Sequence, residues 1–234
     1  MKTLTVILLA TGILASTVSA DPALHLKVDK FDFGWTPINS TVETSFWLKS
    51  SGTDTLEIVV MVPGTDEITS RIDNRLLAPG DSTKAYFYWD VGGAIGVLDK
   101  YVTIHTNSMR ERPYRVFLSD INVLRPDSLR PITIKPYRFE FSKLSAVSVD
   151  SIDFVITNHS ERFLRLEEVS SPLKECEIVI PESVRPHSEV PGYIRVRPDY
   201  LDSEFVESVT ILMSDGPDYE KRITVPIRRK IFSP

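Results

Sequence analysis

The sequence predicts an all-β protein built from two tandem immunoglobulin-like β-sandwich domains. Short segments of alternating apolar and polar residues recur along the chain, separated by Gly, Pro, Asn and Ser, which is typical of sandwich strands and their turns. No segment keeps a helical period. A set of apolar positions also occurs twice at a nearly constant spacing, which indicates two copies of one structural unit.

The repeat extends over the length of a domain. Three pairs of residues lie 108 residues apart, namely Phe31 and Phe139, Phe46 and Phe154, and Leu56 and Leu164. Two more pairs lie 107 residues apart, namely Tyr86 and Tyr193, and Ile104 and Ile211. We therefore expect one sandwich over residues 21–124, a linker over 125–131 and a second sandwich over 132–234.

Residues 1–20 are expected to be a signal peptide. Lys2 supplies a positive start, an apolar run follows, and Val18-Ser19-Ala20 fits a small-x-small cleavage site. The apolar run is too short for a membrane anchor, which needs about 20 apolar residues, and no second hydrophobic span follows. We expect a mature chain without a membrane span, located in the periplasm or outside the cell.

The composition is that of a soluble globular protein, with 42% hydrophobic and 25% charged residues. The net charge is −5, whereas binding to nucleic acid requires a clustered excess of Lys and Arg that neutralises phosphates. We therefore expect no nucleic-acid partner. The nearest basic cluster lies close to the C-terminus, and we interpret it as a solvated strand and tail formed by Arg222, Arg228, Arg229 and Lys230.

The strands of the first sandwich follow from alternation of apolar and polar residues. We expect strands over residues 24–28, 31–33, 42–49, 56–60, 85–90, 101–106 and 114–118, with a turn at Gly34. Trp47 lies between the inward-facing Phe46 and Leu48, so it is predicted to project from the outer face. The alternative is that Trp47 packs beneath a loop or against the second domain. Trp89 shares a face with Phe87 and is predicted to lie in the core.

The second sandwich repeats this plan after a linker with two prolines, Pro126 and Pro131. Inward-facing residues are expected over 149–156 and at Ile194 and Val196, and the last strand is expected over 223–227. Pro226 cannot donate a hydrogen bond to a neighbouring strand, so this last strand is predicted to be an edge strand there.

Several short motifs resemble a known family. They are Phe31-Asp32-Phe33-Gly34, Lys49-Ser50-Ser51-Gly52, Leu77-Ala78-Pro79-Gly80-Asp81 and Ile104-His105-Thr106-Asn107. This arrangement resembles the bacterial exported "domain of unknown function 1573" family, which is similar to the immunoglobulin-like domains of Hydin and of major sperm protein. The second copy is more divergent, because it lacks the Gly after Phe141 and the Pro-Gly turn. The resemblance implies the fold and export, and it implies no reaction.

One departure from the family pattern concerns cysteine. Many members carry Cys-Gly-Cys after the strand that corresponds to residues 56–60, but no cysteine occurs there in this chain. The only cysteine is Cys176. It alternates with Ile178 and Ile180, so we interpret it as a buried thiol in the core, with an intermolecular bridge as the alternative.

No catalytic or metal-binding pattern is found. The four histidines are scattered and lack metal-ligand spacing, so neither a metal nor another cofactor is expected. Gly92, Gly93 and Gly96 precede an expected strand rather than a helix, which argues against a phosphate-binding loop. Loop carboxylates are abundant, but abundance alone does not identify a hydrolase. We therefore expect a protein that is not an enzyme.

The leading functional hypothesis is an exported interaction or structural module that binds an unknown exported or envelope protein through sandwich edges and loops. Trp47 is the first candidate contact, because an exposed Trp is a good anchor for a partner. The alternative is a periplasmic pilus-type assembly chaperone that acts by strand donation, with Val116 and Leu118 on the donated strand at 114–118. An exported hydrolase is the third possibility, for which the sequence offers no specific residues.

Overall fold

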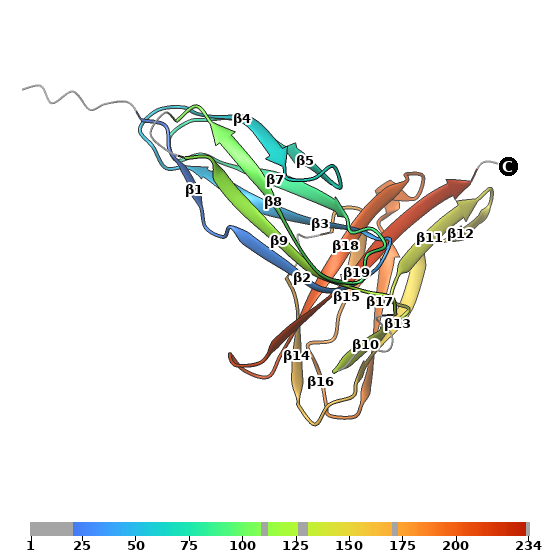
Figure 1. Cartoon of the computed structure of the whole chain (residues 1–234). Helices are drawn as coiled ribbons and strands as arrows, with labels where there is room; N and C mark the ends of the chain where they lie inside the picture. The colour runs from blue at the N-terminus through green and yellow to red at the C-terminus, as the bar shows by residue number, and fades with distance from the viewer. Residues whose placement is uncertain (1–20, 109–111, 126–130, 170–172, 233–234) are drawn as a thin grey trace, which may run out of the picture.

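The computed structural model describes residues 21–108, 112–125, 131–169 and 173–232. The expected signal peptide, residues 1–20, lies outside the described residues, as do residues 126–130 of the expected linker. The described chain is almost entirely β-structure, with one short 3-10 helix, η2 (Pro198–Tyr200). Figure 1 shows two groups of strands that meet at an angle near the middle of the molecule.

The first sandwich consists of two facing sheets. One sheet contains, in spatial order, β1 (Leu24–Leu26), β3 (Thr41–Ser50), β7 (Ser82–Asp90) and β5 (Ile68–Ile72). The other contains β2 (Lys30–Pro37), β9 (Tyr114–Val123), β8 (Gly96–Thr106), β4 (Leu56–Pro63) and β6 (Leu76–Leu77). All the predicted strands of this half are present, and β5 and β6 are additional short strands that alternation alone did not predict.

The second sandwich has the same strand order. Its first sheet contains β10 (Ile132–Lys135), β13 (Ser151–Asn158), β17 (Glu189–Val196) and β15 (Cys176–Val179). The other contains β11 (Phe139–Leu144), β19 (Glu220–Phe232), β18 (Phe205–Ser214), β14 (Leu164–Glu168) and β16 (Ser183–Val184), with β12 (Val147–Val149) paired to β11. Strand by strand, this order matches that of the first sandwich, so the repeat seen in the sequence corresponds to a repeat of topology.

Each sandwich encloses its own apolar core. One cluster of buried residues runs from Leu24 to Leu118 and the other from Ile132 to Ile227. Aromatic contacts contribute to both cores: Phe46 packs edge-on against Phe87 at 5.6 Å between ring centroids in the first, and Phe154 lies 5.1 Å from Phe139 in the second. Trp89 is fully buried, as predicted.

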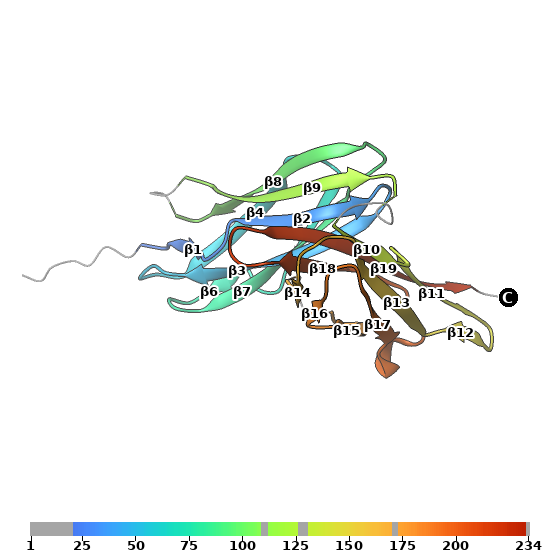
Figure 2. The same ribbon diagram turned by 90° about the horizontal axis from the view of Figure 1, so that it is seen from below.

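The two sandwiches share one continuous sheet. At Ile223, β19 of the second sandwich pairs with Trp35 on β2 of the first, and β2 pairs in turn with β9. Figure 2 shows β19, β2 and β9 side by side. Thr224 Oγ1 donates a hydrogen bond of 2.6 Å to the carbonyl oxygen of Phe33, and Arg222 donates one of 3.1 Å to the carbonyl oxygen of Asp32. The junction is therefore held by backbone acceptors that do not titrate.

The prediction that the last strand is an edge strand at Pro226 is wrong. β19 pairs with β18 along one side, while on its other side it pairs with β2 at Ile223 and with β11 from Ile227 onward. Pro226 lies in the short interval between these two partners, so neither β2 nor β11 requires a donor from it. The strand is interior to the sheet, and the proline sits at the point where its partner changes.

Candidate functional site

Trp47 lies on the outer face of β3, where alternation predicted it. The side chain is 59% exposed, so it packs neither beneath a loop nor against the second sandwich. Lys84 lies directly opposite on β7, and its Nζ is 5.4 Å from the centroid of the Trp47 ring. A lysine at this distance from an indole face gives a favourable cation–π contact, which restricts both side chains.

A second aromatic–cation pair adjoins the first. Arg71 on β5 lies opposite Tyr86 on β7, and its guanidinium is 4.1 Å from the Tyr86 ring centroid. Asp73 accepts hydrogen bonds from Arg71, at 2.8 Å, and from the Tyr86 hydroxyl, at 3.2 Å. We call the four residues Trp47, Arg71, Lys84 and Tyr86 the aromatic–cationic face. It combines flat apolar surface with ordered charges, which is the chemistry of a partner-binding surface.

The aromatic–cationic face belongs to the same sheet surface that meets the second sandwich. Further along β3, the backbone N–H of Glu43 donates a hydrogen bond of 2.9 Å to Ser208 Oγ on β18. Burial, followed by the carboxyl of Glu175, raises the pKa of Glu43 to about 7, although Arg71 and Lys84 lower it. The face therefore lies next to the contact between the two sandwiches.

The prediction that Val116 and Leu118 contact a partner is corrected by the structure. Both side chains are fully buried in the core of the first sandwich. Alternation along 114–118 showed that two faces exist but did not show which one is inside, and the outer face carries Phe117, which is 42% exposed and lies 6.5 Å from Tyr101 between ring centroids. The strand itself, β9, pairs with β8 on one side and β2 on the other.

Buried acidic residues were not anticipated from the sequence. Asp120 is fully buried on β9 and accepts a hydrogen bond of 2.5 Å from Thr36 Oγ1, and burial raises its pKa to about 7. The neighbouring Asn122 donates to the carbonyl oxygens of Val91 and Ala94. This network fixes the loop before β8 to the sheet, so its role is structural. The sequence did contain a sign of this burial, because the carboxylate of Asp120 occupies an inward-facing position of an alternating strand.

Cys176 is a free thiol, fully buried on β15, which confirms its interpretation as a core residue. Burial, followed by the nearby carboxyls of Glu207 and Glu175, raises the pKa of the thiol well above its usual range. Because the thiolate is the reactive form, we expect the folded protein to react with a thiol reagent at pH 8 about 100-fold more slowly than the unfolded chain. Labelling at the same rate before and after denaturation would contradict this.

Among the described residues, no group of three or more His, Cys, Asp or Glu side chains is arranged to hold a metal ion. Within the same residues, no helix is long and apolar enough to cross a membrane.

Comparison with known proteins does not assign the chain to a family. No family model matches it, and no curated protein matches it, so membership of the family that its motifs resemble is not shown. A protein of unknown function from Porphyromonas gingivalis W83 is 14% identical and covers 88% of this chain and 99% of its own, with a TM-score of 0.33.

Two further solved structures are similar over most of their length. The periplasmic chaperone SfaE is 12% identical, with coverage of 90% of this chain and 100% of its own and a TM-score of 0.31. The tandem Ig repeats of Dlar are 6% identical, with coverage of 92% and 100% and a TM-score of 0.36. The strand orders described above establish the architecture independently: the chain is all-β and consists of two tandem immunoglobulin-like sandwiches.

Proposed function

We propose that this chain is an exported, non-enzymatic interaction module that binds a partner protein through its aromatic–cationic face. The observation that carries the proposal is Trp47, a large side chain left 59% exposed and held in place by Lys84. Aromatic and arginine side chains are the residues that most often dominate the energy of an interface. The face is carried by the paired strands β3, β7 and β5, so binding requires little ordering of the backbone.

The proposed location is the periplasm or the outside of the cell, and the proposed partner is another exported or envelope protein. This part of the proposal rests on the signal-peptide pattern of residues 1–20.

The pilus-type chaperone is a weaker alternative. Strand donation from 114–118 would require β9 to leave β2 or β8, and it would expose Val116 and Leu118 from the core. A chaperone function would therefore have to use an unpaired edge, such as the outer edge of β5 or β15.

Affinity capture from the native envelope with purified mature protein tests the proposal. We expect Trp47→Ala to reduce recovery of the partner at least about 30-fold, because truncating a dominant interface residue costs about 2 kcal/mol or more. The matched control is Val147→Ala, which truncates a side chain 73% exposed on the second sandwich. Equal recovery by wild type and Trp47→Ala would contradict the proposed surface.

A further inference from the structure

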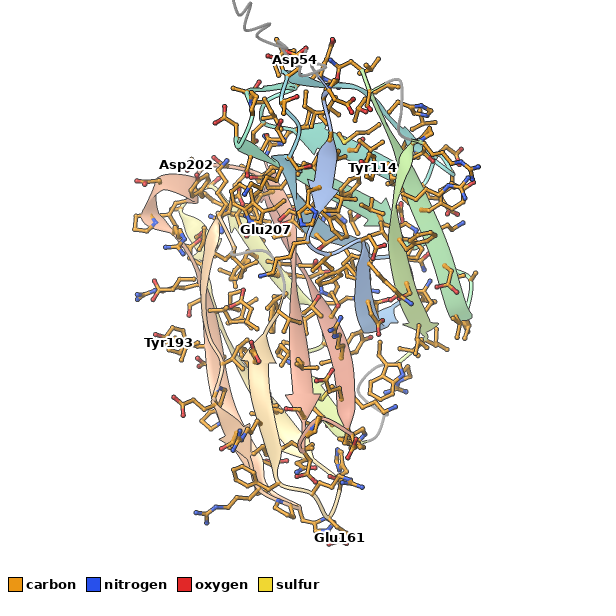
Figure 3. All side chains as sticks on the ribbon, turned by 90° about the vertical axis from the view of Figure 1, so that its left-hand side faces the viewer. Asp54, Tyr114, Glu161, Tyr193, Asp202 and Glu207 are labelled. Carbon is orange, nitrogen blue, oxygen red and sulfur yellow. The ribbon has the colours of Figure 1, made fainter. Side chains whose placement is uncertain are left out.

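The last strand of the first sandwich has a stretch of free edge. β9 begins at Tyr114, but its pairing with β2 begins only at Phe117, which lies opposite Lys30. On its other side, β9 pairs with β8 from Tyr114 onward. Among the residues that the structure describes, residues 114–116 therefore pair with a strand on one side only. Figure 3 labels Tyr114, at the start of this stretch, within the first sandwich.

The backbone groups of Arg115 point toward the free edge. In a strand, the N–H and C=O groups of every second residue point to the same side. The N–H of Phe117 donates to the carbonyl oxygen of Asp29 at 2.7 Å, so the N–H and C=O of Arg115 also point to the β2 side. Tyr101, opposite Phe117 on β8, agrees with this direction, because its carbonyl oxygen faces away from β9 and accepts from Gly64 at 2.9 Å. No described residue pairs with the N–H or C=O of Arg115 on that side.

The second sandwich shows what can occupy such an edge. Leu118 on β9 and Ile227 on β19 are equivalent, because they pair with the repeated phenylalanines of β2 and β11. The free stretch of β9 therefore corresponds to the stretch of β19 just before Pro226. There, Ile223 pairs with Trp35 of β2, which runs parallel to β19 and comes from outside the second sandwich. An extended strand from another domain thus fits this edge of the repeat, and in the first sandwich no described strand takes that place.

A second copy of this chain cannot supply the strand in the same way. At the repeat spacing of 108 residues, Trp35 is equivalent to Lys143 on β11. Lys143 pairs with Ser148 of β12 on one side and with Ile231 of β19 on the other. Both edges of β11 are therefore covered, which leaves the place to a strand of a different protein.

The groove beside the free edge is positively charged. It has a volume of about 970 Å³ and lies between β1 and the beginning of β9. Its lining includes Lys27, Arg112 and Arg115, and Asp29 is the one carboxylate among the described residues that line it. None of the three cations forms an ion pair with a described residue. The groove therefore favours acidic side chains, although the whole chain has a net charge of −5.

Arg115 is positioned to recognise a side chain of the added strand. Its guanidinium lies 4.9 Å from the centroid of the Tyr101 ring, a cation–π contact that restricts the side chain. Arg115 is exposed whereas Val116 is buried, so the Arg115 side chain lies on the outer face of the sheet. On an added strand, the residue opposite Arg115 lies on the same face, where opposite charges on paired strands attract. An Asp or Glu at that position is therefore favoured.

We propose that residues 114–116 of β9 form a second binding site, which takes an extended acidic segment of a partner protein as an added strand. Backbone hydrogen bonds to Arg115 hold the main chain of the segment, and Lys27, Arg112 and Arg115 select its acidic side chains. The site goes beyond the proposed function, because β9 belongs to the opposite sheet from the aromatic–cationic face.

A synthetic octapeptide of alternating threonine and glutamate tests the proposal with the mature protein, at low ionic strength, where charge pairs are least screened. We expect saturable binding that slows hydrogen exchange of the Arg115 amide at least about tenfold, with a smaller change at Phe117, whose N–H is already bonded. The same peptide N-methylated throughout keeps its charges but donates no backbone hydrogen bonds, and the lysine counterpart carries the opposite charge. We expect both to bind at least about tenfold more weakly. No binding of the acidic peptide, or equal binding of either control peptide, would overturn the proposal.

Arg115→Glu is the decisive variant, because Arg115 is exposed and its replacement leaves the core intact. We expect its affinity for the acidic peptide to fall at least about tenfold, whereas Arg228→Glu, at an exposed arginine of the second sandwich, should bind like wild type. If Arg115→Glu does not fold, Lys27→Glu provides the same comparison. Wild-type affinity in Arg115→Glu, or in Lys27→Glu where it replaces it, would contradict the proposal. Dimerisation of the mature protein that Arg115→Glu abolishes would identify a second copy as the occupant and would also overturn it.

Discussion

Gly34→Ala is expected to destabilise the protein by about 3 kcal/mol or more, through the junction between the two sandwiches. Gly34 has a φ of 68°, which L-residues adopt at a cost of about 1–2 kcal/mol. It also lies where β2 passes close to β19, because an added Cβ would be 2.1 Å from the carbonyl oxygen of Arg222. That contact cannot be relieved by a side-chain rotation, so the two strands must separate.

Gly92→Ala is the matched control for this prediction. Gly92 has a similar φ of 63°, but an added Cβ would meet nothing within 4 Å. Chemical denaturation measures the free energy of unfolding of both variants. The loss shared by the two reports backbone strain, and the additional loss in Gly34→Ala reports the close approach of β2 and β19. We expect Gly92→Ala to lose only about 1–2 kcal/mol of the free energy of unfolding. Equal losses in the two variants would show that the β2–β19 contact contributes nothing beyond strain.

Arg229→Ala is expected to lower the free energy of unfolding by about 3–5 kcal/mol, because it removes one member of a largely buried ion pair. The Arg229 side chain is fully buried on β19, and its Nη1 lies 2.7 Å from Asp150 Oδ1. It also donates to the carbonyl oxygen of Leu201 at 2.6 Å and to Ser148 Oγ at 3.2 Å. The residue therefore fastens both the β11–β12 hairpin and the segment after η2 to the last strand.

The neighbouring Arg228 supplies the control, since it is exposed on the opposite face of the same strand. Arg228→Ala is expected to change the free energy of unfolding by less than about 0.5 kcal/mol, measured by the same denaturation. A loss for Arg229→Ala as small as that for Arg228→Ala would contradict its role as a buried anchor. The interpretation of the C-terminal basic residues as a solvated strand and tail was thus wrong for Arg229.

Features that depend on local patterns were predicted correctly from the sequence. The period-2 alternation placed Trp47 outside and Trp89 inside, and the constant spacing of Phe46 and Phe154 predicted two sandwiches of the same topology. The glycine after Phe33 was also singled out, although as a turn. Gly34 also lets β2 approach the backbone of Arg222 on β19. The second copy lacks this glycine because the corresponding edge of β11 faces only its own hairpin partner, β12.

Features that depend on contacts between residues distant in sequence could not be predicted from local patterns. Pro226 suggested an edge strand, but the strand changes partner there instead of ending the sheet. Alternation at Val116 and Leu118 identified a face without identifying which side was covered. Glu207 is buried where the segment before β15 passes over it, and the backbone N–H groups of Lys174 and Glu175 that bond to it are distant in sequence.

Site-specific photo-crosslinking in the native host tests the central claim most directly. A photoreactive amino acid replaces Trp47 in one protein and Val147 in the other, and both residues are large exposed side chains on different sandwiches. The account predicts one crosslinked partner protein from position 47 and none from position 147. No crosslink at position 47, or the same products from both positions, would contradict the assignment of the aromatic–cationic face as the binding surface.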